Sequence, residues 1–226
     1  MTDPKALFDK AWRDEVNKRK AESPSVPFEQ YTATGRSSAK YPNKEDASWW
    51  ADNGPGMVEK FIEWRNATRW DIWETPDGQN GIELEIRVEL PQSKIPLLMF
   101  LDRVYVTPVG QLTVVDLKTG RTPDISEQLG FYATGIELKY GPEFRPQWGF
   151  WYDARKGEVS KPMSLDFWTP AVVEARALEV VAAINAGSFP ARPANGCERW
   201  CSSRQFCAIV GGPKAHLHDP LLQIQS

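Results

Sequence analysis

The sequence predicts an α/β (α+β) protein with a central mixed sheet flanked by helices and an irregular, cysteine-containing C-terminal extension. Four short β-type runs lie between about residues 69 and 118, and turn residues such as Pro-Asp-Gly and Pro-Val-Gly separate them. Helix-type stretches precede and follow these runs, and the C-terminal residues show neither pattern. With 226 residues, 41% of them hydrophobic, the chain is long enough for one domain with a sizeable core and appendages.

Composition and charge exclude several classes of protein. Ten Trp and ten Phe residues argue against a wholly disordered chain. A net charge of −3 argues against a strongly basic nucleic-acid wrapper, although a local basic groove is compatible with it. There is no run of 18 apolar residues, and the charged N-terminus lacks the apolar stretch of a secretion signal. We therefore expect an intracellular, cytoplasmic protein with no membrane partner, where disulfides are rare.

The N-terminal part is expected to be helical. Asp3 can cap a helix with Pro4 at its first position, and the Pro-containing stretch after Glu22 should end it. A short helix beginning at Ala47 is expected to break at Gly54-Pro55-Gly56, because proline lacks the N–H that a helix interior needs. A second helix should follow that break.

The β-type runs predict an antiparallel meander over about residues 69–74, 82–90, 98–107 and 111–118. A further helix over about residues 125–140 and a Trp- and Tyr-rich strand over 147–154 should come next. The last helix is expected over 170–186, with Gly187 as its stop signal.

Two acidic residues, Asp102 and Asp116, stand in otherwise mostly apolar strands. If the hairpin between them turns near Val109, residues whose numbers sum to about 218 pair, which places the two acids opposite each other. Direct cross-strand neighbours have Cβ atoms about 4.5–5.5 Å apart. Two ionised carboxylates that close repel each other, and Mg²⁺ or Mn²⁺ with oxygen ligands would relieve the repulsion.

Lys118 follows Asp116 by two residues, so both side chains point to the same face of the strand. Its ammonium can orient a nucleophilic water or stabilise charge that develops on a scissile phosphate. The candidates for a third ligand are Glu59 and Glu63, which share a face of the preceding helix. The alternative is an edge hairpin with solvated acids and a solvated helix face.

Three segments together resemble the PD-(D/E)XK nucleases of the RecB type. That family reads roughly G-x-x-D-R-V, then (V/I)-D-(Y/L)-K-T-G, then Q-L-x-x-Y-A. This chain is especially similar to the single-domain CRISPR-associated RecB-like exonucleases and their phage-encoded relatives, over about residues 56–140, although the glycine before the first Asp is absent. The matching segments are Leu101-Asp102-Arg103-Val104, Val115-Asp116-Leu117-Lys118-Thr119-Gly120, and Gln128-Leu129 followed by Tyr132-Ala133.

The resemblance implies a restriction-endonuclease-like core and a metal-dependent deoxyribonuclease. The nuclease core would span residues 47–187, after an N-terminal helix and loop at 1–46 and before a cysteine tail at 188–226 that packs on the core. The implied substrate is DNA, cut as an exonuclease cuts single-stranded or end-accessible strands. Partners in recombination, or in CRISPR or phage DNA processing, follow from the same resemblance.

The resemblance also implies roles for individual residues. Glu59 takes the place of the His or Glu that the family carries on its core helix three residues after a glycine, here Gly56. A carboxylate there is a competent Mg²⁺ or Mn²⁺ ligand. The other implied site residues are the metal ligands Asp102 and Asp116, the catalytic Lys118, and Gln128 and Tyr132, which would position Lys118 or the DNA strand.

Three cysteines, Cys197, Cys201 and Cys207, fall within eleven residues near the C-terminus. Thiols this close in an intracellular protein indicate a metal or cluster site. Iron–sulfur members of the resembled family hold a 4Fe-4S cluster with three cysteines after the core and one before it, which this chain lacks. The alternatives are a cluster with another fourth ligand, a Zn²⁺ completed by His216 or His218, and relic cysteines that pack as small hydrophobic residues.

Two other function classes stay open at the level of sequence. A catalytically weak DNA-end-binding adaptor would keep the fold and a structural Fe–S or Zn site, and would bind DNA with strong salt dependence. A glycosidase would use the paired acids without a metal and would leave Lys118 without a role.

Overall fold

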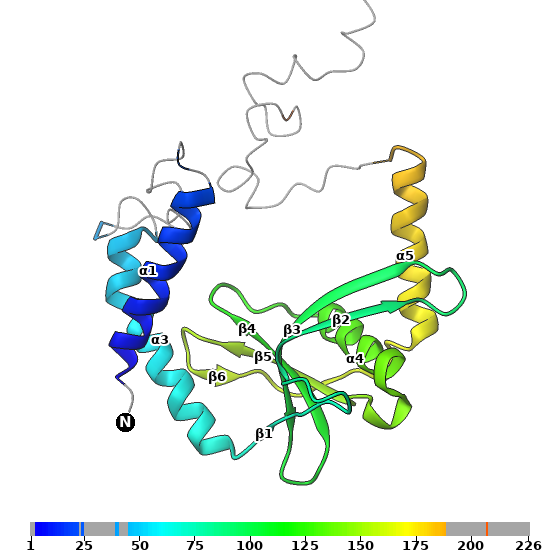
Figure 1. The fold of residues 1–226 in the computed structure, drawn as a ribbon, viewed down its shortest axis with the longest axis horizontal. Helices are drawn as coiled ribbons and strands as arrows, with labels where there is room; N and C mark the ends of the chain where they lie inside the picture. The colour runs from blue at the N-terminus through cyan, green and yellow to red at the C-terminus, as the bar shows by residue number, and fades with distance from the viewer. Residues whose placement is uncertain (1–2, 23, 25–38, 41–44, 189–206, 208–226) are drawn as a thin grey trace, which may run out of the picture. The chain divides into compact units, whose positions relative to one another are not determined.

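The computed structural model describes residues 3–22, 24, 39–40, 45–188 and 207. The chain divides into two compact units, residues 1–180 and 181–226. Across the described segments, no helix is long and apolar enough to cross a membrane. The elements, drawn in Figure 1, are α1 (Pro4–Glu22), α3 (Ala47–Thr68), β1 (Asp71–Ile72), β2 (Ile82–Glu89), β3 (Pro96–Val106), β4 (Leu112–Lys118), α4 (Glu127–Tyr140), the 3-10 helix η1 (Pro142–Phe144), β5 (Trp148–Asp153), β6 (Glu158–Val159), β7 (Met163–Ser164) and α5 (Pro170–Asn185).

The strands form one seven-stranded mixed sheet. Strand β3 pairs antiparallel with β1, β2 and β4, while β4 pairs parallel with β5, which also carries β6 and β7. Helix α4 links the parallel strands β4 and β5, because parallel neighbours need a crossover connection. The predicted fold class, a mixed sheet flanked by helices, is confirmed.

The predicted register of the β3–β4 hairpin is also confirmed. Arg103 pairs with Val115 and Val104 with Val114, so the paired numbers sum to 218. The ladder ends at the Arg103–Val115 pair, one step before Asp102 would face Asp116. The two acids therefore lie where β3 and β4 separate.

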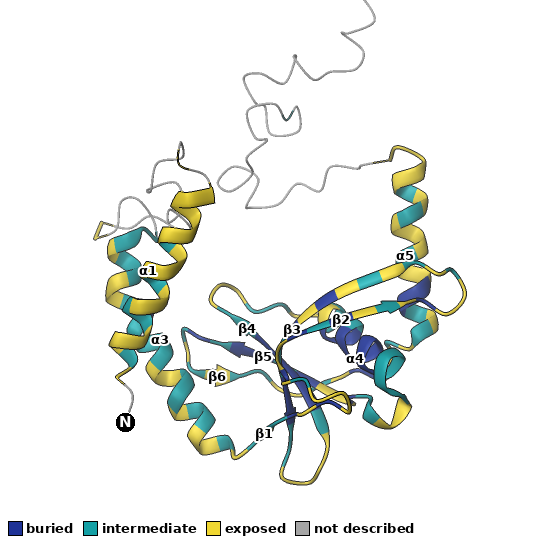
Figure 2. Ribbon diagram, in the orientation of Figure 1, coloured by how far each residue is buried: buried dark blue, intermediate teal, exposed yellow. Residues whose placement is uncertain are grey.

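Each face of the sheet packs against a helix. Strand residues alternate in direction, so Val114 joins the core under α4 with Leu129 and Ile136, whereas Val115 joins the core under α3. Phe61 of α3 packs against this second core. Figure 2 shows the buried residues concentrated in the sheet and α4, and α1 has no buried residue.

The predicted break at Gly54-Pro55-Gly56 is wrong, because α3 runs unbroken through Pro55. Its N-terminus is capped by Asp46, whose side chain accepts the Trp49 N–H at 3.0 Å. Gly54 is buried against α1 so closely that a Cβ there would overlap the Phe8 ring. We infer that packing on α1 and on the sheet outweighs the hydrogen bond lost at Pro55.

The remaining elements follow the predicted pattern with shorter bounds. The expected strand over 69–74 is reduced to β1, which pairs with β3 and not with β2, so the predicted meander is wrong at its first strand. The segment after Gly157 forms two short strands, β6 and β7, which both pair with β5. Helix α4 begins two residues later than expected, after Ser126. Most of the loop expected between the N-terminal helix and residue 46 lies outside the described residues.

Candidate active site

The candidate site lies at the carboxyl end of β4. Asp116 and Lys118 point to the α4 side of the sheet, and Asp116 is 2% exposed. Strand β5 runs parallel to β4 here, and open α/β sheets bind ligands at the carboxyl ends of parallel strands. The burial of Asp116 excludes the alternative of a fully solvated edge hairpin.

Asp102 reaches the same end of β4 from the neighbouring strand. Its Oδ2 accepts a hydrogen bond from the backbone N–H of Leu117 at 2.7 Å. The carboxylate thus lies against the backbone between Asp116 and Lys118. The structure brings the two acids together, as their cross-strand register predicts.

Lys118 is held by several groups at once. Its Nζ lies 2.5 Å from Oδ1 of Asp116 and donates a hydrogen bond to Oδ2 at 3.0 Å. The same Nζ donates to Oε1 of Gln128 at 3.2 Å and lies 4.9 Å from the centre of the Trp151 ring. Gln128 in turn donates to the Tyr132 hydroxyl at 2.6 Å. The ammonium therefore has a fixed position beside the acids.

The electrostatics of Asp116 suit a cation. Burial raises the pKa of its carboxyl to about 6; the hydrogen bond from Lys118 opposes this rise, and the nearby charge of Asp102 adds to it. Oδ1 is buried and makes no hydrogen bond, although the Lys118 ammonium is close to it. A buried carboxylate oxygen beside a second carboxylate is a donor set that Mg²⁺ or Mn²⁺ prefers.

The structure does not gather a third acidic ligand. Glu59 is exposed on α3. Over the residues that the structure covers, no three His, Cys, Asp or Glu side chains lie close enough together to hold an ion. The role of Glu59 as a ligand therefore stays a prediction.

The predicted cysteine site falls mainly on residues that the structure does not describe. Cys207 is half-buried and is a free thiol. Cys197, Cys201, His216 and His218 lie outside the described residues. The iron–sulfur and zinc alternatives therefore stay predictions.

Arg155, which the sequence did not single out, anchors the turn after Lys118. Its Nε donates to the carbonyl of Thr119, and its guanidinium lies 4.8 Å from the centre of the Trp49 ring. Nη2 also pairs with Glu45 at 2.9 Å. These contacts join the site to the start of α3. In the sequence Arg155 belongs to an ordinary turn, so no local signal identifies it.

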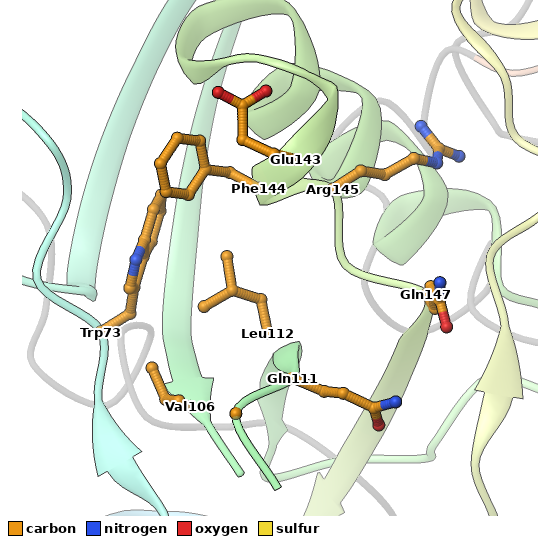
Figure 3. Close-up of a pocket in the computed structure, with 9 residues that line it drawn as sticks. Trp73, Val106, Gln111, Leu112, Glu143, Phe144, Arg145 and Gln147 are labelled. Atoms are coloured by element: carbon orange, nitrogen blue, oxygen red, sulfur yellow. The ribbon is translucent and has the colours of Figure 1, made fainter.

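A separate cavity of about 370 Å³ lies at the other end of β4 (Figure 3). Trp73 and Phe144 pack against each other on one side of it, with ring centroids 5.9 Å apart, and Leu112 of β4 also lines it. Leu112 and Asp116 are four residues apart on one strand, about 13 Å. The cavity is therefore distinct from the carboxylate site.

Two carboxylates and a lysine meet at the end of a buried strand, an arrangement that places oxygen donors for a divalent cation beside a fixed positive charge. A model of the PD-(D/E)XK nuclease superfamily matches residues 3–208, and the chain therefore belongs to this superfamily. Its fold is the restriction-endonuclease-like fold of these enzymes, which cut nucleic acid and typically use Mg²⁺ or Mn²⁺.

Two phage proteins are similar to this chain. The Gene 69 protein of Mycobacterium phage D29 is 30% identical over 212 residues, which cover 92% of this chain and 76% of that protein. The Gene 69 protein of Mycobacterium phage L5 is 30% identical over 198 residues, which cover 71% of this chain and 67% of that protein.

Proposed function

We propose that the protein is a RecB-like, metal-dependent exonuclease that hydrolyses phosphodiester bonds in single-stranded or end-accessible DNA. One observation carries this proposal above the others. The Lys118 ammonium is fixed between the buried Asp116 carboxylate and Gln128, and Asp102 meets the same strand end. The D-R-V, D-L-K-T-G and Q-L-x-x-Y-A segments support the RecB-like assignment within the superfamily.

The residues of the site divide the chemistry between them. Asp102 and Asp116 would hold Mg²⁺ or Mn²⁺, with Glu59 as a further candidate ligand. When bound, such an ion polarises a phosphate oxygen and lowers the pKa of water. Lys118 presents a fixed positive charge to the phosphate as negative charge develops on it. Gln128 accepts a hydrogen bond from Lys118 and donates one to Tyr132, which fixes the position of that charge.

The wider setting belongs to the same proposal. The similarity to two phage proteins supports a phage-encoded enzyme that acts on DNA in the host cytoplasm during recombination or processing. We propose a nuclease core over residues 47–187, an N-terminal helix and loop over 1–46, and a cysteine tail over 188–226. The tail would hold a 4Fe-4S cluster, or a Zn²⁺ with one of its histidines.

The test is cleavage of end-labelled linear and circular DNA, single- and double-stranded, with Mg²⁺, Mn²⁺ or EDTA. We expect metal-dependent shortening of linear single strands, protection of circular DNA, and loss of cleavage in Asp116→Ala. The ladder of labelled fragments then gives the polarity.

Other outcomes would support the alternatives. A folded protein that binds DNA in a salt-sensitive way but cleaves none in any metal would be an adaptor. Hydrolysis of a glycoside substrate that is unaffected by EDTA would indicate a glycosidase that uses its paired acids. Cleavage of circular DNA at internal positions would contradict the exonuclease assignment and keep the nuclease.

A further inference from the structure

Glu83 has a left-handed backbone inside a strand. Its φ is 50°, in the second position of β2. The other non-glycine residues with positive φ in the described part of the chain, Arg69 and Lys94, lie outside the strands. An L-residue with a long side chain is disfavoured there, and such outliers cluster at active sites. The position therefore needs an explanation.

Glu83 lies opposite Asp102. The ladder between β2 and β3 pairs Ile82 with Arg103 and Leu84 with Leu101, so Glu83 and Asp102 lie on opposite strands between these two pairs. Directly opposed residues of an antiparallel pair are close neighbours. An acidic residue that the sequence did not single out is therefore next to one of the proposed metal ligands.

The regular alternation of side chains along β3 is interrupted at this point. Leu101 and Val104 pack into the same core, although residues three apart in a regular strand point to opposite faces. Asp102 lies between them, and the left-handed residue Glu83 lies across from it. The irregular step in β3 thus lies at Asp102 and Arg103, across from Glu83.

The present contact of Glu83 does not explain why a glutamate stands there. Its Oε1 lies 3.1 Å from Nη1 of Arg103, but the Glu83 side chain is 67% exposed. An exposed ion pair contributes little to stability, and glycine would fit the left-handed backbone better. Neither the stability of the fold nor the backbone geometry therefore accounts for a glutamate at this position.

The Glu83 charge acts on the same site as the two aspartates. Burial raises the pKa of the Tyr132 hydroxyl, its hydrogen bond with Gln128 opposes the rise, and the charges of Asp116, Asp102 and Glu83 add to it. The contribution of Glu83 is the smallest of the three.

We propose that Glu83 is a third acidic residue of the catalytic centre, whose carboxylate leaves Arg103 and joins Asp102 and Asp116 when a divalent metal ion binds. This inference rests on the proposed function. Oδ2 of Asp102 already accepts a backbone N–H, and Oδ1 of Asp116 is buried with the Lys118 ammonium 2.5 Å away. Two carboxylates leave most positions around a six-coordinate ion unfilled. The exposed, long side chain of Glu83 would supply another oxygen.

The test is calorimetric titration of Mn²⁺ into the full-length protein after removal of metal with EDTA. We expect Asp116→Ala to abolish Mn²⁺ binding. Glu83→Gln and Glu83→Gly should each weaken the Mn²⁺ affinity by about ten-fold or more. The matched control is Glu85→Gln, two residues along the same strand, where the carboxylate pairs with Arg87. We expect this variant to bind Mn²⁺ like the parent.

The variants also separate this inference from the proposed function. Glu83→Gly should melt at or above the parent temperature, because glycine relaxes the left-handed backbone. If it fails to fold, Glu83→Gln decides, since glutamine keeps the shape of the side chain. Parent-like Mn²⁺ affinity in Glu83→Gln, with binding lost in Asp116→Ala, would overturn the role of Glu83 alone. No Mn²⁺ binding by the parent would overturn both.

Discussion

Ionisation of the buried Asp116 carboxyl lowers the stability of the folded, metal-free protein. The burial that raises its pKa to about 6 disfavours the carboxylate at neutral pH, and the nearby charge of Asp102 adds to this effect. Lys118 compensates only in part, because the pKa stays raised. A bound divalent cation would offset the remaining cost, so this residue links metal binding to stability.

The pH dependence of stability tests whether ionised Asp116 destabilises the metal-free protein. The unfolded carboxyl titrates near 3.8 and the folded one near 6, so the metal-free protein loses stability as pH rises from about 4 to about 6. In EDTA at pH 7, Asp116→Asn should therefore raise the free energy of unfolding by about 1–3 kcal/mol. The melting temperature should rise by about 2–10 °C.

At pH 4 this gain should largely disappear, because the parent carboxyl is then protonated. Asp124→Asn is the control, since that carboxylate is exposed and its removal should shift melting little at either pH. An Asp116→Asn protein that melts below the parent at pH 7 in EDTA would refute the account of this residue.

At the residue scale, the sequence predicted the contacts that follow from the pairing of two strands joined by a short turn. Asp102 and Asp116 come together because a short turn near Val109 fixes the pairing of their strands. Arg155 and Glu83 could not be found this way. Arg155 contacts Thr119 and Trp49, which are distant in sequence, and Glu83 stands out by its left-handed φ. Neither feature leaves a pattern in the sequence.

At the element scale, α3 shows how tertiary packing overrides a local breaker. Gly54-Pro55-Gly56 has the composition of an interruption, yet the helix continues. The two glycines differ in their surroundings: Gly54 lies against Phe8 of α1, and nothing lies near the Cβ position of Gly56. The burial of Gly54 depends on α1, a helix distant in sequence. The local sequence pattern therefore predicted a helix break that the structure does not have.

This difference predicts opposite effects of one substitution. Gly54→Ala should lower the melting temperature, because its Cβ would overlap the Phe8 ring. Gly56→Ala should raise the free energy of unfolding by about 0.5–1 kcal/mol, because alanine favours a helix interior and finds open space there. Thermal denaturation of both variants tests this, and equal shifts of the same sign would contradict the α1–α3 packing described above.

At the scale of the whole molecule, the antiparallel pairing of β2, β3 and β4 was predictable from alternation and turns. The pairing of β1 with β3 and the parallel pairing of β4 with β5 were not. Nothing local in the Trp- and Tyr-rich strand indicates that β5 pairs with β4 rather than extending the meander. The crossover through α4 decides this, and it also brings Gln128 and Tyr132 beside Lys118. The site is therefore a product of the topology as much as of the motifs.

The cysteine tail makes a separate prediction for the whole chain. If Cys197, Cys201 and Cys207 hold a 4Fe-4S cluster, protein purified without air should contain iron and acid-labile sulfide. Cys201→Ala should then lower bound iron and melting temperature more than the rate of DNA cleavage. Zinc without sulfide would support the histidine-completed site, and unchanged metal content and melting would indicate relic cysteines.

The most direct test of the central claim is single-turnover cleavage of labelled single-stranded DNA in Mn²⁺ by Lys118→Met, with Mn²⁺ binding measured on the same protein. We expect parent-like or tighter Mn²⁺ binding, because the carboxylates stay and a competing cation is removed. The cleavage rate, the second quantity measured, should be lowered by about 100-fold or more, because the charge that stabilises the transition state is lost. A parent-like rate in this variant would contradict the proposed centre.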